Sequence, residues 1–237
     1  MKQVYLNGRF LPQEEASISI FDRGFLFADA VYEVTTVIGG KLIDFPRHMY
    51  RLKRSLVEIG ISQIPETEAL LSIHQELIRR NRMKEGTLYL QVSRGAAPRD
   101  FSFPASSVPP TIVAFAQAKT LIGKGYKEEG QRIMTIEDLR WGRSDIKSVQ
   151  LLYPCLVRNL ACSRGLDDAW LVKDGYVTEG VSSNACIVTN DGVLVTRHLS
   201  SAILGGITRD AIVRAAREMG LALEERPFTV REAQLAA

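Results

Sequence analysis

The chain has 237 residues, of which 46% are hydrophobic and 24% are charged, a balance typical of globular proteins rather than of disordered or fibrous ones. The formal net charge is only +3 and the basic residues are spread along the chain, so the electrostatic signature of a nucleic-acid-binding protein is missing. The composition favours a small phosphate-bearing ligand over a polymer.

Three cysteines occur at a spacing that matches neither a disulfide framework nor a zinc site. They are Cys155, Cys162 and Cys186, and we expect buried thiols in a reducing compartment. The N-terminal residues lack the apolar core of a signal peptide, and no apolar run approaches the roughly 18 to 20 residues that span a bilayer. The sequence therefore predicts a cytoplasmic protein.

The first half of the chain alternates hairpin, helix and strand signals. Asn7-Gly8 lies between two apolar stretches and favours a tight hairpin turn, whereas Leu52, Leu56 and Ile59 repeat at helical spacing before Gly60. The expected elements are hairpins over 4–11 and 31–43, a helix ending near Gly60, a helix over 66–82, and strands over 87–92 and 111–116.

A Lys- and Gly-rich stretch without sustained periodicity follows, and it predicts a linker over 119–130. The domains are then a small N-terminal α+β domain, 1–118, and a larger β-rich C-terminal domain, 131–237. In the second half we expect a helix after Ser148, hairpins turning at Asp174-Gly175 and Asp191-Gly192, and a helix over 208–219. The fold class is α+β with two lobes.

Lys147 precedes an apolar helical stretch. Burial disfavours the charged form of a lysine, and a neutral amine is the species that condenses with an aldehyde. A single lysine is more often a solvated surface charge, so its companions along the chain decide the interpretation.

Three companions fit one phosphorylated pyridine cofactor. Glu179 ends a predicted strand, and a carboxylate there can keep a pyridine nitrogen protonated. Gly205-Gly206 leads into a helix whose first N–H groups can bind a phosphate, and Arg51 offers a guanidinium for the same anion. Each also has an ordinary alternative: an exposed strand end, a common loop-to-helix junction, and a solvated basic helix face.

Together these segments resemble the fold-type IV pyridoxal-phosphate enzymes, and most closely the D-amino-acid aminotransferases. The resemblance covers nearly the whole chain in the right order. Its motifs are Asp22-Arg23-Gly24, Val31-Tyr32-Glu33-Val34, His48 to Leu52, Gln91 to Gly95, Asp145-Ile146-Lys147-Ser148, Val177-Thr178-Glu179-Gly180 and Gly206-Ile207-Thr208-Arg209.

The resemblance implies roles for individual residues. Lys147 corresponds to the lysine that carries pyridoxal 5′-phosphate and moves the proton, and Glu179 to the partner of the ring nitrogen. Arg51, Ile207 and Thr208 correspond to phosphate ligands, and Leu204 to the side chain that supports the ring. An amino acid would then pass its amino group to the cofactor, and a 2-oxo acid such as 2-oxoglutarate or pyruvate would take it up in ping-pong fashion. A homodimer is also implied.

Substrate binding is where the chain departs from the family. Tyr32 and Arg99 match two residues that hold the substrate carboxylate, but the family's histidine is replaced by Phe101, and Asp100 adds a carboxylate beside the arginine. Aminodeoxychorismate lyase and branched-chain or amine transaminases of the same fold therefore remain alternatives, as does a catalytically silent binding protein.

Two features of the second half are unusual for the family. Pro154 falls within the helix after Lys147 and predicts either a kink or a late helix start. Thr229 to Glu232 has the pattern of a capping box that opens a helix, yet the sequence stops at Ala237, where we expect the family to continue.

Overall fold

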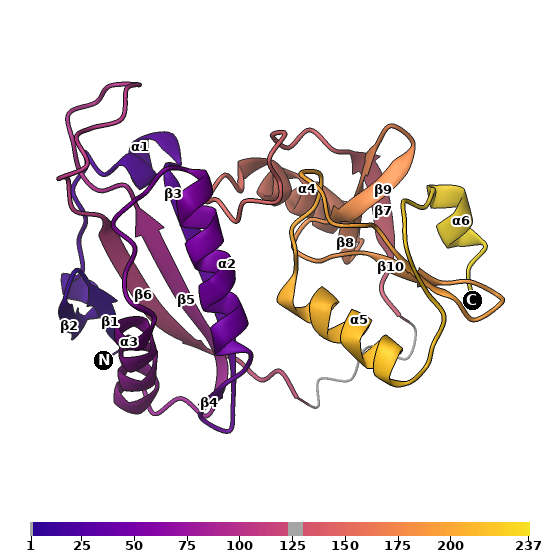
Figure 1. Ribbon diagram of the computed structural model, residues 1–237, viewed down its shortest axis with the longest axis horizontal. Helices are drawn as coiled ribbons and strands as arrows, with labels where there is room; N and C mark the ends of the chain where they lie inside the picture. Colours follow the sequence, from indigo (N-terminus) through magenta and orange to yellow (C-terminus); the bar gives the residue numbers. More distant parts are fainter. Residues whose placement is uncertain (1, 123–129) are drawn as a thin grey trace. The chain divides into compact units, whose positions relative to one another are not determined.

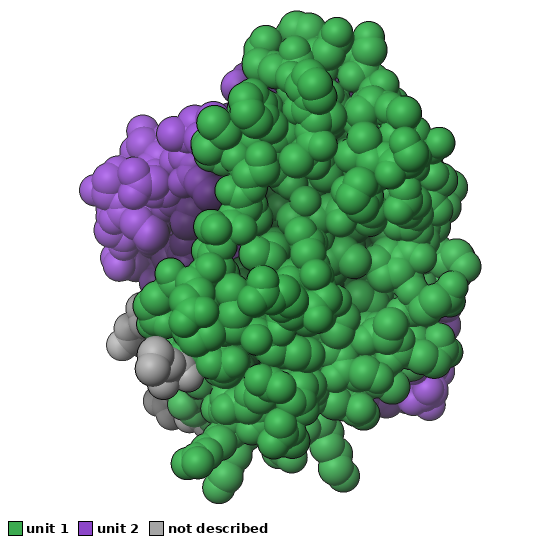
Figure 2. All heavy atoms as spheres, turned by 90° about the vertical axis from the view of Figure 1, so that its left-hand side faces the viewer, with its two compact units in different colours: residues 1–125, 147–149 green, residues 126–146, 150–237 purple. Residues whose placement is uncertain are grey.

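A computed structural model describes residues 2–122 and 130–237. The chain forms two compact units, which Figure 2 shows in different colours. Unit 1 comprises Met1–Gly125 and Lys147–Val149, and unit 2 comprises Tyr126–Ile146 and Gln150–Ala237. The linker expected over 119–130 lies mostly outside the described residues. In contrast to the continuous second domain that we expected, the short segment around Lys147 belongs to unit 1.

Unit 1 is built on a six-stranded sheet in the order β2-β1-β6-β5-β3-β4, and all neighbouring strands are antiparallel (Figure 1). The first hairpin forms as predicted, because Asn7 and Gly8 both adopt the positive φ of a two-residue turn. The strands are β1 (Gln3–Leu6), β2 (Arg9–Pro12), β3 (Ala30–Ile38), β4 (Lys41–Leu42), β5 (Glu85–Ser93) and β6 (Thr111–Ala118).

Two long helices of unit 1 pack on this sheet (Figure 1). They are α2 (Phe45–Glu58) and α3 (Thr67–Arg80), which confirm the two predicted helices, and the short η1 (Gln13–Glu15) and α1 (Arg23–Phe27) complete the unit. Strand β3 alternates buried and half-buried residues, as expected when helices cover one face of a sheet. Leu52 and Leu56 of α2 are fully buried in the resulting core.

Unit 2 contains two three-stranded sheets, β7-β8-β9 and β10-β11-β12. The predicted hairpins form at Asp174-Gly175, between β8 and β9, and at Asp191-Gly192, between β10 and β11. The elements are β7 (Ile133–Glu137), α4 (Leu152–Ser163), β8 (Asp168–Lys173), β9 (Tyr176–Gly180), β10 (Cys186–Val188), β11 (Leu194–Thr196), α5 (Ile207–Glu218), β12 (Leu223–Glu225) and α6 (Val230–Gln234).

Details of unit 2 settle three expectations. Helix α4 begins at Leu152, so Pro154 lies in its first turn, where no intrahelical N–H bond is lost, and the late start is the correct alternative. The capping box of Thr229 and Glu232 forms at α6. The cysteines are free but exposed, so the expectation of burial is wrong: a small apolar side chain on the outer side of α4 or on a short strand need not face the core.

The described residues contain no helix that is long and apolar enough to cross a membrane. With helices and sheets in both units, the secondary structure agrees with the predicted α+β class.

Candidate active site

The backbone of Lys147 is joined to the edge of β3. The Tyr32 N–H donates to the Lys147 carbonyl at 3.0 Å, and the Val149 N–H donates to the Ala30 carbonyl at 3.1 Å. Val31 and Ser148 form an antiparallel bridge. Tyr32 therefore lies opposite Lys147, and directly opposite residues of antiparallel strands point to the same face.

Tyr32 and Lys147 do share that face. The Lys147 ammonium nitrogen lies 4.3 Å from the centre of the Tyr32 ring. Tyr32 stacks on Tyr89 at 5.5 Å, and Tyr89 stacks on Phe115 at 4.8 Å, so that an aromatic row crosses β3, β5 and β6. Burial raises the pKa of Tyr89 to about 12, with a smaller contribution from Tyr32. The aromatic row holds the Tyr32 ring beside the lysine.

Helix α2 carries Arg51 to the covered face of the sheet. The Arg51 guanidinium donates from Nε and Nη2 to the two oxygens of Glu33, at 2.8 and 2.7 Å, and His48 Nδ1 lies 2.7 Å from the same carboxylate. Burial alone would raise the pKa of Glu33, but the hydrogen bonds and charges of Arg51 and His48 outweigh it and lower the pKa. The solvated basic face is thus the wrong alternative for Arg51, which is buried.

Ser55 connects Arg51 with the lysine segment. It follows Arg51 by four residues, so both side chains lie on one face of α2 about one turn apart. The Ser55 hydroxyl accepts the Lys147 N–H at 3.4 Å, and Ser55 itself is fully buried. Within unit 1 the structure therefore places Tyr32 beside the Lys147 side chain and joins the Lys147 backbone to α2, the helix that carries Arg51. The role of Arg51 as a phosphate ligand remains a prediction.

Glu179 is the penultimate residue of β9 in unit 2 and is buried. Its carboxylate accepts hydrogen bonds from Arg140, from the Asn184 amide at 2.9 Å and from the Leu204 N–H at 3.1 Å. Burial raises the pKa of Glu179, and the Arg140 charge opposes that rise. The exposed strand end is therefore the wrong alternative for this glutamate.

Arg140 is in turn held by Asp138. Its Nε and Nη2 donate to the two Asp138 oxygens at 2.9 and 2.7 Å, and the Thr178 hydroxyl donates to Asp138 at 2.8 Å. Burial would raise the pKa of Asp138, but Arg140 and Thr178 lower it overall. Asp138, Arg140 and Glu179 therefore form a row of alternating charges. Its middle member, Arg140, favours the ionised form of Glu179.

The loop before α5 supplies the remaining residues predicted for unit 2. Gly206 is the N-cap of α5 and contributes no side-chain hydrogen bond, so the first turn is not capped by that residue. Ile207 and Thr208 open the helix, where N–H groups and the helix dipole favour an anion. The Leu204 backbone is anchored on Glu179. The structure thus brings Glu179 and Leu204 together beside the start of α5.

Arg99 lies on an exposed loop of unit 1. Its guanidinium carbon is 5.4 Å from the centre of the Phe27 ring and 5.8 Å from that of Phe101, and the two rings are 5.8 Å apart. The Arg99 guanidinium and the two rings therefore form one small cluster. Asp100 accepts the Ser102 N–H, which lowers the pKa of Asp100.

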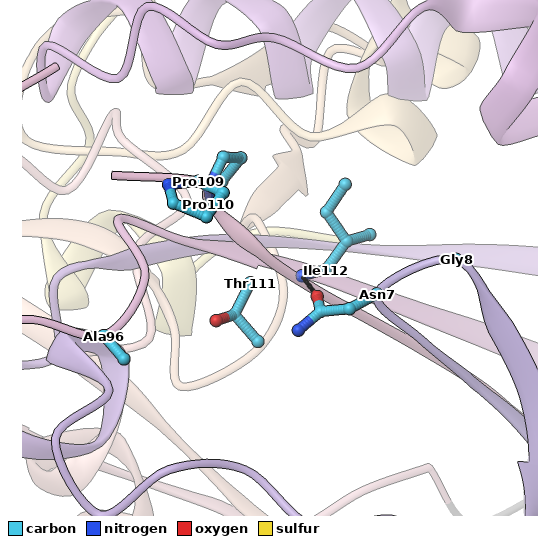
Figure 3. Close-up of a pocket in the computed structure, with 7 residues that line it drawn as sticks. All are labelled: Asn7, Gly8, Ala96, Pro109, Pro110, Thr111 and Ile112. Carbon is cyan, nitrogen blue, oxygen red and sulfur yellow. Dashed lines mark hydrogen bonds between the residues drawn. The ribbon is translucent and has the colours of Figure 1, made fainter. Parts of the chain in front are cut away.

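A pocket of about 460 Å³ opens elsewhere in unit 1, at the turn between β1 and β2 (Figure 3). It is lined by residues 7–8, Ala96 and 109–112. None of these side chains titrates, and none belongs to the predicted site, so the pocket does not supply the chemistry.

The sequence over residues 30–237 matches the family model of the class IV aminotransferases (Amino-transferase class IV). A D-alanine aminotransferase of Staphylococcus aureus is 37% identical over 97% of this chain and 81% of its own length. The chain therefore belongs to the class IV aminotransferase family.

Solved structures of branched-chain enzymes agree with the fold. A branched-chain amino acid aminotransferase of Escherichia coli superimposes with a TM-score of 0.89 at 22% identity, over 99% of this chain and 80% of its own. A branched-chain aminotransferase of the archaeon Thermoproteus uzoniensis, solved with norvaline, gives a TM-score of 0.85 at 27% identity, over 99% of this chain and 80% of its own. The likeness extends over both units and establishes the two-lobed fold.

This class IV aminotransferase depends on pyridoxal 5′-phosphate. The donor set suits that group, because the enzyme offers a buried carboxylate backed by Arg140, a helix start for a phosphate and a lysine beside an aromatic ring. Sequence reasoning missed the functional neighbours of these residues: Glu33, Ser55, Asp138, Arg140 and Asn184. Glu33 and Asn184 stand within or beside motifs noted in the sequence, but Arg140 and Asp138 carry no local signal.

Proposed function

We propose that this aminotransferase moves the amino group of a D-amino acid to a 2-oxo acid such as 2-oxoglutarate or pyruvate. The observation that carries the proposal is Glu179, a buried carboxylate that is held in place by Arg140, by the Asn184 amide and by the Leu204 N–H. A pyridine ring withdraws electrons best when its nitrogen is protonated, and such a carboxylate holds that proton. The D-configuration is supported by the name of the relatives, D-alanine aminotransferase, at 37% identity.

Each residue of the proposed site has its own role in this reaction. Pyridoxal 5′-phosphate supplies an aldehyde and an electron-accepting ring. Lys147 Nζ binds the cofactor and moves the proton at the substrate α-carbon. Glu179 holds the proton on the ring nitrogen, and Leu204 supports the ring. Arg51 and the first residues of α5, Ile207 and Thr208, bind the phosphate, so that the cofactor keeps its position while the substrate changes.

Substrate recognition falls to Tyr32 and Arg99 in this proposal. Tyr32 is fixed by its stack on Tyr89 and lies at the lysine. Arg99 is the charged group that would bind the carboxylate, because a guanidinium binds that group bidentately. Phe101 has no donor to add, so the arginine carries the charge recognition alone. We further propose that the enzyme is a homodimer, as the family resemblance implies, and that it is cytoplasmic.

An amino-donor panel tests this function. The purified enzyme is loaded with pyridoxal 5′-phosphate and given D-alanine or L-alanine with 2-oxoglutarate, or D-glutamate or L-glutamate with pyruvate. L-Leucine and an amine without a carboxylate are each given with both acceptors. We expect turnover with the D-enantiomers and at least tenfold slower turnover with their L-counterparts. Preference for L-leucine would instead support a branched-chain transaminase.

Three further functions are tested by the amine of this panel, by aminodeoxychorismate added as a further substrate, and by an absorbance scan of the protein. Preference for the amine would support an amine transaminase, in which Phe101 gives an apolar wall at the position of the family's histidine. Pyruvate release from aminodeoxychorismate would support the lyase. Absence of a visible cofactor band would indicate the silent binding protein.

A further inference from the structure

Asn184 joins two parts of unit 2 that the proposed function assigns to the same cofactor. Its amide nitrogen donates to Glu179 Oε2 at 2.9 Å and to the Leu204 carbonyl at 2.8 Å. The Leu204 N–H returns a hydrogen bond to the Glu179 carboxylate. Glu179, Asn184 and Leu204 therefore form a closed ring of hydrogen bonds between the end of β9 and the loop before α5.

The turn that carries Asn184 is itself tight. The Gly180 N–H donates to the Ser183 carbonyl at 2.7 Å, and a Cβ atom at position 180 would lie 2.4 Å from the Ser183 hydroxyl. The Ser183 hydroxyl would therefore have to move to make room for a side chain at 180. The geometry of residues 180–183 thus directs Asn184 back toward Glu179.

The side-chain oxygen of Asn184 explains the second glycine of the Gly205-Gly206 pair. Gly206 has φ −69° and ψ 137°, a conformation open to any residue, so backbone strain does not require glycine. A Cβ atom there would lie 2.0 Å from Asn184 Oδ1. The nearest contact of a Cβ atom at Gly205 would be Leu199 at 3.8 Å, which is ordinary packing. Of the two glycines, only Gly206 is fitted to Asn184.

We propose that Asn184 is a positioning residue that holds Glu179, the proposed partner of the ring nitrogen, against the loop that leads into α5, the proposed phosphate site. Gly206 leaves the space that the Asn184 side chain needs. The inference rests on the proposed roles of Glu179 and of the start of α5. The Asn184 amide nitrogen donates to both the Glu179 carboxylate and the Leu204 carbonyl. The distance between Glu179 and the start of α5 is therefore set before the cofactor binds. Pre-organisation of this kind raises affinity because ordering is not left to the binding step.

The test is a cycle of Asn184→Ala, Gly206→Ala and the double variant, with Asn190→Ala as control. Asn190 lies in the same unit and donates to the Leu235 carbonyl in an exposed hydrogen bond. Three quantities are measured: the dissociation constant of pyridoxal 5′-phosphate by fluorescence quenching, the urea midpoint of the cofactor-free protein, and the pH titration of the visible band. Asn184→Asp is added because it keeps the shape but places a second carboxylate beside Glu179.

We expect each single variant to weaken cofactor binding at least tenfold, the scale of one hydrogen bond to a charged group. The double variant should bind the cofactor no more weakly than the single variant with the larger loss of affinity. Removing the Asn184 side chain makes room for the methyl group at 206, so the second substitution adds no further loss. Asn184→Asp should shift the titration of the visible band, since a neighbouring carboxylate disfavours ionised Glu179. Asn190→Ala should match the parent enzyme.

Multiplicative losses in the double variant would overturn the proposal, because they would mean that Gly206 is required for the phosphate and not for Asn184. An unshifted band titration in Asn184→Asp would also overturn it. If the parent protein binds no pyridoxal 5′-phosphate, the proposed function fails, and the urea midpoints of the cofactor-free variants still decide whether Asn184 and Gly206 are coupled.

Discussion

Removing the charge of Glu33 should strongly destabilise unit 1. The carboxylate is fully buried, accepts two hydrogen bonds from Arg51 and contacts His48. Glu33→Gln keeps the shape but leaves the buried guanidinium without its counter-charge. Breaking a buried ion pair from one side costs about 3 to 5 kcal/mol, so we expect a loss of that size in the free energy of unfolding.

Urea denaturation followed by circular dichroism measures this loss, and its pH dependence identifies the cause. The pKa of Glu33 is lowered in the folded state from an ordinary value of 4.5, so its contribution is fully present above that value and disappears as the pH falls through the lowered pKa. The difference between the parent protein and Glu33→Gln should therefore shrink in acid. A loss below about 1 kcal/mol at pH 7, well short of the cost of a broken buried pair, or a difference that does not change with pH, would refute the reasoning.

Three further predictions concern the proposed catalytic residues. Lys147→Ala should abolish the visible cofactor band and multiple turnover, and borohydride reduction followed by peptide mapping of the parent enzyme should label Lys147; a label on another lysine would contradict the assignment. Glu179→Gln should slow the half-reaction by two or more decades, about 2.7 kcal/mol or more of barrier, with a smaller effect on cofactor affinity; near-normal stopped-flow rates would exclude Glu179 from the ring. Arg99→Ala should cost on the order of 1.5 to 3 kcal/mol with amino acids and almost nothing with an amine that lacks a carboxylate; equal effects on both half-reactions would mean that the carboxylate is held elsewhere.

Local signals in the sequence were sufficient for most of the fold. The turn at Asn7-Gly8, the helix stop at Gly60 and the capping box at Thr229 depend on residues within one or two turns of each other, and all three form. The order of motifs was sufficient for the family, because it extends over nearly the whole chain.

Long-range partners were not predictable in the same way. Nothing near Arg51 in the sequence marks Glu33 as its counter-charge, since the pair forms only when α2 packs on β3. Arg140 likewise reaches Glu179 across 39 positions of the chain. The return of Lys147 to unit 1 requires pairing with β3, which lies far earlier in the chain, and periodicity within a segment cannot report such a contact.

The alternation of β3 explains why these long-range contacts matter for the lysine. Tyr32 and Glu33 are consecutive, so their side chains point to opposite faces of the sheet: Tyr32 lies beside Lys147, and Glu33 binds Arg51 on the face covered by α2. A shift of β3 by one residue would place Glu33 at the lysine and leave Arg51 without this carboxylate. Because an unpaired buried charge is costly, the Glu33–Arg51 pair penalises that shift. The ion pair behind the sheet thus holds the register that presents Tyr32 to Lys147.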